Sequence, residues 1–393
     1  MRDDPMTKYV IVREDDDPER SGTRSVRSDG QPIVDIVEVD GENEAAELRN
    51  DPDILIAAAD VPMQLHKPFG SDADIKTARV AWGVRAVGAV RSGRQGNGAT
   101  VAILDTGIDE QHPAFAHLGE RMIVKDFSGS GPGDPNGHGT HCAGTIFGQE
   151  VNGTRIGVAP GVDRVLIGKV LDNDGGGGSV AIARGVLWAI QEGANVVSLS
   201  LGIDFPGLVD SCVRDRDFPV DLATSRALVA YRNNLRLFDS IAKLAGAVGP
   251  FGQPAVLIGA SGNESRRHIN PEYEIAVAPP AASSDFIAVG AVGEEGSNYD
   301  IAAFSNTEVD LVGPGVDVVS ADSGGGLRAL SGTSMATPHV AGVAALWIEE
   351  MRALGQPLTS DGIRANLVAN ADSRSIVTSA RGARCGTGLV QAP

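Results

Sequence analysis

Four polar residues stand where apolar segments of the sequence begin or end, and their side chains together could carry out acyl transfer. Asp105 closes the run VAILD, His138 opens HGTHCAG, Asn263 follows AVLIGASG, and Ser334 precedes MATPHVAG. A serine hydroxyl can attack a carbonyl carbon, a histidine can take up its proton, and an amide N–H can stabilise the oxyanion that forms. The serine does not lie in the G-x-S-x-G turn of the α/β-hydrolases.

Each of these residues also has a simpler interpretation when it is taken alone. A carboxylate after a strand, such as Asp105, often caps a turn, and Asp109 competes with it further along the same loop. An asparagine in a Gly-rich segment is a common turn residue. A serine at the start of a helix is often only an N-cap. For each residue by itself these interpretations stay open.

A metal site is an alternative for the histidine segment. His138 and His141 are three residues apart, and Cys142 comes next. Zinc peptidases of the H-E-x-x-H type instead place two histidines four residues apart around a glutamate. No further cluster of cysteines and histidines in the sequence supports a metal, so we expect none at these residues.

From about residue 75 onward, apolar runs rich in β-branched residues alternate with helical patterns. The runs predict strands at 99–104, 164–171, 195–201, 255–259 and 286–292. The helical patterns lie at 138–148, 178–192, 219–247, 334–353 and 359–370. Apolar strands that alternate with helices indicate an α/β fold with a parallel sheet covered on both faces. Reactive groups of such folds gather at the carboxyl ends of the strands, where Asp105 and Asn263 lie.

The beginning of the chain predicts a smaller α+β unit. Strands are expected at 8–14, 33–39 and 53–59, and a short helix at 43–50. The sequence His66-Lys-Pro-Phe-Gly70 that follows has the composition of a linker. The unit has too few elements to hold an active site of its own.

Taken together, the motifs resemble those of the subtilisin family of serine peptidases. VAILDTGID, HGTHCAG and GTSMATPHVAG occur in the order of that family, with SGN between the last two, and the resemblance covers about residues 75–393. It implies a three-layer α/β fold with a mostly parallel central sheet, and serine endopeptidase activity. It also implies that Asp105, His138 and Ser334 form the catalytic triad. Asn263 and the backbone N–H of Ser334 would then form the oxyanion hole.

The resemblance also predicts where an extended peptide substrate binds. It assigns this role to Ser200, Leu201, Gly202, Gly177, Gly178, Ala260, Ser261 and Gly262. The first three residues and the two glycines would form opposite edges of a cleft that takes the peptide as an added strand. The last three would form walls of the pocket for the side chain before the scissile bond. Small walls without an acid at the floor predict a preference for Leu, Met or Phe.

The first part of the chain resembles a subtilisin propeptide, a small α+β domain of ferredoxin-like type. The matching segments are KYVIVRE and ELRNDPDILIAAADVPMQLH. This implies two domains, residues 1–67 and 68–393, of which the first assists folding and caps the cleft in cis. Self-processing of such a proenzyme is expected near Leu65–Lys67.

Two departures from the family concern calcium and the length of one segment. Ala114 stands where the strongest calcium site of the family has an acidic residue, and the companion loop Gln149–Arg155 has no asparagine at the expected position. We therefore expect that site to be absent, no cofactor is certain, and structural calcium elsewhere stays open. The segment between Gly202 and Asn263 is longer than in compact subtilisins.

Composition limits the partners. A formal net charge of −18 argues against nucleic acid, whose phosphates would be repelled. No apolar run reaches the roughly 18–20 residues of a membrane-spanning helix. The three cysteines cannot all pair within one chain, which suggests free thiols and a reducing compartment and leaves one disulfide as the alternative. Because the start lacks the apolar core of a secretory signal, we expect a cytoplasmic protein, or a secreted one if a signal is missing from this sequence. Peptides or proteins are the expected substrates.

Overall fold

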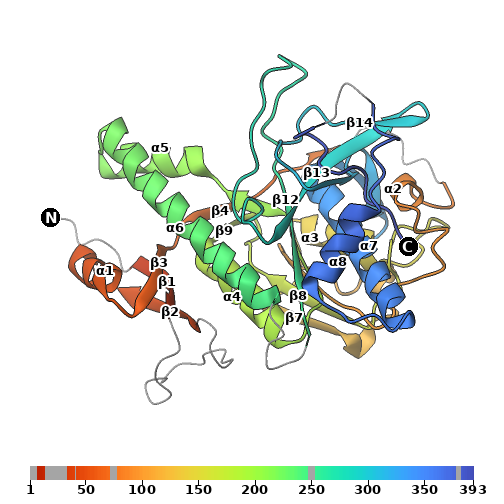
Figure 1. The fold of residues 1–393 in the computed structure, drawn as a ribbon, viewed down its shortest axis with the longest axis horizontal. Helices are drawn as coiled ribbons and strands as arrows, with labels where there is room; N and C mark the ends of the chain where they lie inside the picture. Colours follow the sequence, from red (N-terminus) through yellow and green to blue (C-terminus); the bar gives the residue numbers. More distant parts are fainter. Residues whose placement is uncertain (1–6, 14–32, 40, 71–77, 247–252, 378–381) are drawn as a thin grey trace.

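A mostly parallel sheet of eight strands runs through the larger part of the chain. The computed structural model describes residues 7–13, 33–39, 41–70, 78–246, 253–377 and 382–393 (Figure 1). The sheet consists of β6 (Thr100–Asp105), β7 (Met122–Asp126), β8 (Arg164–Lys169), β10 (Val196–Leu199), β12 (Val256–Ala260), β13 (Phe286–Glu295), β14 (Asn298–Ile301) and β15 (Leu311–Pro314). Its order is β14-β13-β12-β10-β6-β8-β7, and β15 pairs with β13. Only β14 runs antiparallel to its neighbour.

Helices cover both faces of this sheet. One layer holds α2 (Trp82–Ala86), α3 (His138–Phe147), α7 (Thr333–Ala353) and α8 (Ser360–Ala369), and the other holds α4 (Ser179–Gln191) and α6 (Val220–Gly246). Successive side chains of a strand point to opposite faces. Val101 and Ile103 of β6 therefore pack in the first layer, and Ala102 and Leu104 in the second. The predicted three-layer α/β fold is confirmed.

The N-terminal unit is a second, three-stranded sheet with one helix. Its elements are β1 (Thr7–Arg13), β2 (Ile33–Val39), α1 (Gly41–Asn50) and β3 (Ile54–Ala59). β1 lies in the middle and pairs antiparallel with both neighbours. Tyr9 and Ile11 pack on the α1 side, whereas Val10 and Val12 join the core cluster that includes α4 and α6. The sheet of this unit is thus buried on both faces.

Short strands connect the two parts of the chain. β4 (Pro62–Leu65) lies between β9 (Gly176–Gly178) and β11 (Leu201–Ile203) in a second three-stranded sheet. β5 (Phe69–Gly70) pairs with β17 (Leu327–Ser331), which also pairs with β16 (Val318–Ala321). The 3-10 helices η1 (Pro113–Phe115) and η2 (Gly119–Arg121) precede β7. The segment after the N-terminal unit is therefore paired rather than an open linker.

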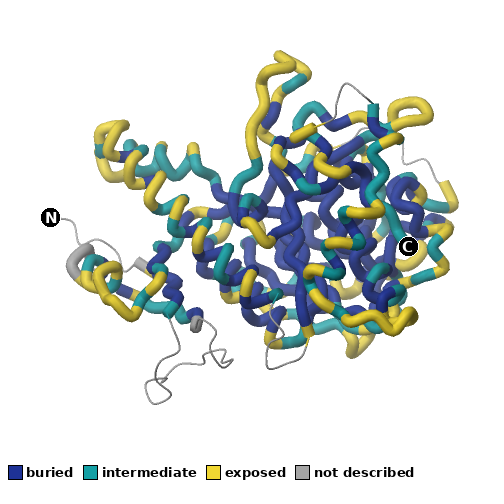
Figure 2. Tube along the Cα trace, viewed as in Figure 1, coloured by how far each residue is buried: buried dark blue, intermediate teal, exposed yellow. Residues whose placement is uncertain are grey.

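An antiparallel pair of helices projects from the body. It consists of α5 (Phe205–Arg216) and the first half of α6, and we call residues 205–234 the arm (Figure 1). Its outer end is largely exposed, whereas buried residues fill the body of the molecule (Figure 2). No helix in the described part of the chain is both long and apolar enough to cross a membrane.

Candidate active site

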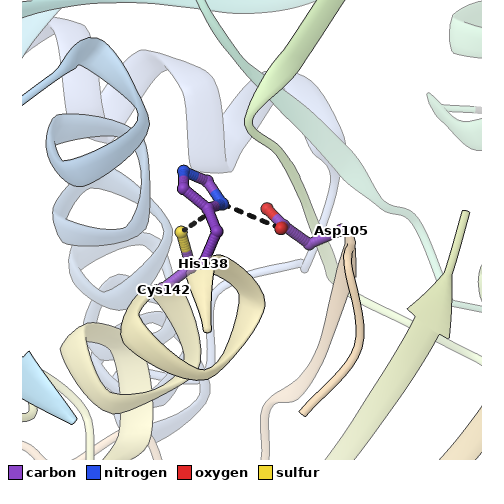
Figure 3. A group of neighbouring side chains, drawn as sticks. All are labelled: Asp105, His138 and Cys142. Atoms are coloured by element: carbon purple, nitrogen blue, oxygen red, sulfur yellow. Dashed lines mark hydrogen bonds and ion pairs between the residues drawn. The ribbon is translucent and has the colours of Figure 1, made fainter. Parts of the chain in front are cut away.

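Asp105 and His138 form a buried hydrogen-bonded pair. Asp105 is the last residue of β6 and His138 the first of α3, and their side chains are 1% and 2% exposed. His138 Nδ1 lies 2.8 Å from Asp105 Oδ1 (Figure 3). The same carboxylate oxygen accepts a hydrogen bond of 2.8 Å from the N–H of Thr106. A proton held on Nδ1 by Asp105 leaves Nε2 as the nitrogen that can accept a proton.

Close backbone packing holds the loop after β6 against the start of α3. A Cβ atom on Gly139 would lie 2.1 Å from the carbonyl oxygen of Gly107, so only glycine fits there. The buried carboxylate of Asp134 accepts hydrogen bonds from Thr106 Oγ1 at 2.8 Å and from the N–H of Thr140 at 2.8 Å. These contacts fix the histidine relative to the strand that carries its carboxylate.

Ser334 is fully buried in the first turn of α7. Its Oγ donates to the carbonyl oxygen of His66 at 3.2 Å and lies 3.5 Å from the carbonyl oxygen of Ser200. His138 Nε2 is buried and has no hydrogen-bond partner among the residues that the structure describes. The Ser334 hydroxyl thus donates to a peptide carbonyl in this structure, and no hydrogen bond joins it to His138 Nε2.

The oxygen and the nitrogen of the Asn263 side-chain amide form hydrogen bonds with different partners. Its Oδ1 accepts hydrogen bonds from the N–H and the Oγ1 of Thr333, both at 2.9 Å. Its NH₂ group therefore faces the opposite way, where Nδ2 donates to the carbonyl oxygens of His66 at 3.3 Å and Lys67 at 3.2 Å. Ser334 and Asn263, which were predicted as nucleophile and oxyanion donor, both contact the carbonyl of His66.

The chain itself passes through the predicted substrate cleft. β4 pairs antiparallel with β11, where Leu65 faces Leu201, and with β9, where Met63 faces Gly177. Beyond the His66 carbonyl, Phe69 pairs with Ser331 of β17. The predicted edge residues Leu201, Gly202, Gly177 and Gly178 thus pair with an extended segment of this same chain. Ser200 precedes β11 and its Oγ donates to the carbonyl oxygen of Ser334 at 3.3 Å.

The predicted pocket residues at the end of β12 and directly after it support the turn that carries Asn263. Ala260 and Ser261 are fully buried. Gly262 has a φ of +112° and its N–H donates to Thr333 Oγ1 at 3.2 Å. Through that hydroxyl the turn is joined to the start of α7.

Glu264 lies beside the ring of His66 and was not predicted from the sequence. The ring of His66 packs on Gly202, where an added Cβ would lie 2.6 Å from the ring Cε1. His66 Nδ1 lies 3.5 Å from Glu264 Oε1, and Asn306 Nδ2 donates to Glu264 Oε2 at 2.7 Å. Burial opposes the charge of Glu264, but its hydrogen bond and charge interaction with His66 lower the pKa of this carboxyl. The only sequence signal was an acid directly after Asn263.

Lys169 is a second residue that the sequence did not reveal. Although its side chain is buried, Nζ donates to the carbonyl oxygens of Thr106 at 2.7 Å and Gly133 at 3.0 Å, and to Asn173 Oδ1 at 2.8 Å. Three oxygens therefore surround the ammonium group. It ties the residue after Asp105 to two neighbouring loops.

The pair Asp105–His138 controls the electrostatics of the site. Burial opposes charge on His138, but charge interactions and hydrogen bonds, first with Asp105 and then with Cys142, together raise the pKa of His138 well above the ordinary value. Cys142 Sγ lies 3.8 Å from His138 Nδ1, and burial raises the pKa of this thiol, so it is neutral near pH 7 (Figure 3). Burial also lowers the pKa of His141 to about 3, which keeps that ring neutral.

The potential metal ligands of the site overlap the pair of Asp105 and His138. Within the described ranges, one group of three potential ligands lies close enough together, namely Asp105, His138 and Cys142. It coincides with the acid–base pair. His141 is not part of it, because its Nε2 donates to the carbonyl oxygens of Val318 at 3.0 Å and Arg328 at 3.2 Å. Ala114, at the position of the family's calcium ligand, is buried in the core.

Comparisons with known proteins agree with this geometry. The sequence profile of the Subtilase family matches residues 96–388. The chain is 32% identical over 351 residues to the thermostable alkaline protease of Halalkalibacterium halodurans, an alignment that covers 86% of this chain and 80% of that protein. It is 35% identical to the intracellular serine protease of Paenibacillus polymyxa, with 66% and 69% covered. It is 36% identical to subtilisin BL of Lederbergia lenta, with 68% and 83% covered. The chain belongs to the subtilase family and is a serine endopeptidase.

Proposed function

We propose that Ser334, His138 and Asp105 form the catalytic triad and that Asn263 is the oxyanion donor. The observation that carries this proposal is the carbonyl of His66, which receives hydrogen bonds from both Ser334 Oγ and Asn263 Nδ2. A peptide carbonyl is thus held between the nucleophile and the group that would stabilise its negative charge. The buried pair of Asp105 and His138 supplies the base.

In the first half of the reaction, the hydroxyl proton of Ser334 moves to His138 Nε2 as Oγ attacks the carbonyl carbon. The oxygen becomes an oxyanion, which Asn263 stabilises. His138 then gives its proton to the leaving amine as the C–N bond breaks, and an acyl-enzyme remains. The Asp105 carboxylate stabilises the imidazolium of His138 and holds the histidine proton on Nδ1.

In the second half, a water molecule attacks the ester carbon of the acyl-enzyme. His138 takes a proton from this water and returns it to Ser334 Oγ as the ester bond breaks. The products are a carboxylic acid and a regenerated serine hydroxyl. The two edge strands β9 and β11, which pair with β4 in the structure, support the proposal that substrates bind as the middle strand of this ladder.

We propose further that the N-terminal unit is a propeptide that the enzyme removes itself. The pose of the His66 carbonyl supports a cut between His66 and Lys67. The sequence-based boundary, with domains 1–67 and 68–393, lies one residue further along the chain. Before and after this cut, β4 would occupy the cleft and block other substrates. The unit would thus be both a first substrate and an inhibitor in cis.

Intact-mass measurement of purified wild type and Ser334→Ala tests both proposals. We expect wild type to separate into a fragment ending at His66 and a body beginning at Lys67, and Ser334→Ala to stay full length. Substantial hydrolysis of a peptide substrate by Ser334→Ala would refute the assignment of the nucleophile. Wild type that stays full length and yet is fully active would refute self-processing.

We also propose that this peptidase works in a reducing compartment such as the cytoplasm. The three cysteines, Cys142, Cys212 and Cys385, are all unpaired. Structural disulfides are typical of oxidising compartments, and free thiols are more common where thiols are kept reduced. Fractionation of the source cells followed by immunodetection would test this placement.

A further inference from the structure

The arm touches the N-terminal unit at a place outside the cleft. Asn234 of α6 is fully buried, and its Nδ2 donates to the carbonyl oxygen of Ala59 at 3.0 Å and to that of Ala230 at 3.0 Å. The neighbouring Asn233 donates from Nδ2 to the carbonyl oxygen of Ala57 at 3.3 Å. Two adjacent asparagines of the arm thus hold two alternate carbonyls of β3.

Those carbonyls lie on the open edge of a sheet. Among the residues that the structure describes, β3 pairs with β1 on one side only, and the sheet order β2-β1-β3 leaves its other side without a strand. Unpaired carbonyls at a sheet edge are a ready site for hydrogen-bond donors. The two asparagine amides occupy the place that a fourth strand would take.

The arm also has apolar contacts and a groove next to this edge. Leu208 and Ala230 pack against the core cluster that contains Val10 and Ala58 of the N-terminal unit. Beside these contacts lies a groove of about 530 Å³, lined from one side by Tyr9 and Ala45 of the unit and from the other by residues of the arm. The contact is therefore broader than the two hydrogen bonds.

We propose that the arm is a second docking surface for the N-terminal unit, which keeps the unit bound, and the peptidase inhibited, after the His66–Lys67 bond is cut. This inference rests on the inhibitory role proposed above. Two linked contacts hold a partner more tightly than either alone, because release of one leaves the other in place. When β4 leaves the cleft, the arm still holds β3, so β4 returns before a protein substrate enters.

The double variant Asn233→Ala/Asn234→Ala tests this role, with Arg232→Ala, an exposed residue of the same helix, as its control. Each self-cleaved protein is purified together with its N-terminal fragment and then diluted into a small peptide substrate. We expect wild type and Arg232→Ala to show a lag before full activity. The loss of two neutral hydrogen bonds should shorten this lag about tenfold in the double variant, with the same final rate.

Three outcomes are distinguishable. A double variant with the lag of wild type would overturn the role of the arm and leave the inhibitor proposal standing. Wild type that shows no lag while the fragment still co-elutes on size exclusion would instead overturn the inhibitor proposal itself. If the double variant does not mature, the same substitutions are made in full-length Ser334→Ala. There the loss of the two asparagine hydrogen bonds should make amide hydrogen exchange in β3 faster. Unchanged exchange in β3 would also overturn the proposed role of the arm.

Discussion

At the scale of single residues, the site is organised before any outside substrate binds. Thr333 orients the amide of Asn263 through two hydrogen bonds, and Asp105 orients the ring of His138. Both functional groups are therefore fixed by partners that lie away from the peptide. Such preorganisation lets polar groups stabilise developing charge without rearranging during the reaction.

Replacement of Asn263 by alanine should lower kcat by about 10²–10³, a figure that comes from the loss of one such donor in subtilisin itself. KM should change little, because the donor acts mainly on the oxyanion. Steady-state kinetics on a short peptide measures both constants. Thr333→Val, which removes one of the two bonds that orient the amide, should have a smaller effect on kcat. An unchanged kcat in Asn263→Ala would contradict the assignment.

The pH dependence of activity should follow the protonation of His138. The imidazole acts as a base only when Nε2 is free of a proton. Since Asp105 raises the pKa of His138, the ring is charged at pH values below that raised pKa and activity is lost there. We expect kcat/KM to rise with pH through a midpoint above the ordinary value of about 6.5. A midpoint near pH 5 would be inconsistent with this pair, and in Asp105→Asn the midpoint should move down.

The carboxylate of Glu264 should favour a positively charged side chain before the scissile bond. This modifies the sequence-based expectation of an apolar pocket, because the acid lies beside the ring of His66. Two peptides that differ only in His or Leu at this position are compared at about pH 6. Because the Glu264 side chain is half exposed, its effect is moderated by solvent, and Glu264→Gln should lower kcat/KM only about threefold to tenfold for the His peptide. The Leu peptide is the control, and an equal loss for both peptides would point to a structural effect.

At the scale of elements, the sequence predicted what the long apolar runs specify. The predicted strands and helices are present in the predicted order along the chain, as β6, β8, β10, β12 and β13 and as α3, α4, α6, α7 and α8. Each has a continuous buried face, which a period in the sequence can reveal. Asp105, His138, Asn263 and Ser334 could be proposed as site residues because they stand at the ends of these elements.

The short strands of the cleft could not be predicted in the same way. β9 is three glycines, and β4 and β11 have four and three residues. Runs of this length have no period of their own and become strands only through pairing with distant segments. α5 was also missed: none of its residues is fully buried, and its apolar side chains, such as Phe205 and Leu208, pack only partly buried against the core cluster.

The close fit of His66 against β11 leads to a prediction for this element. In Gly202→Ala the new methyl group would meet the His66 ring, so self-cleavage after His66 should slow. The double variant Gly202→Ala/His66→Ala removes the ring and should recover much of the rate. Mass spectrometry of the processed fraction over time compares these variants with wild type and His66→Ala. Failure of the second substitution to rescue the first would show that Gly202 acts in another way.

At the scale of the whole molecule, the N-terminal unit depends on the body for its core. Val10 and Val12 of β1 lie in a cluster that also includes residues of α4 and α6, so separation would expose them to water. The sequence showed the apolar pattern of this unit. It did not show where the unit docks, because docking joins surfaces that are far apart in the chain, including the arm.

One consequence follows from the continuous path of β4, His66 and β5 through the cleft. Since the His66 carbonyl and Ser334 belong to the same molecule, the proposed self-cleavage does not require two molecules to meet, and the first cut should be a first-order process. Its half-time should stay the same over a hundredfold dilution of newly refolded protein, which intact mass at timed intervals measures. Removal of the N-terminal segment from Ser334→Ala by added active enzyme should instead slow in proportion to dilution. A half-time for wild type that lengthens on dilution would mean that one molecule cuts another.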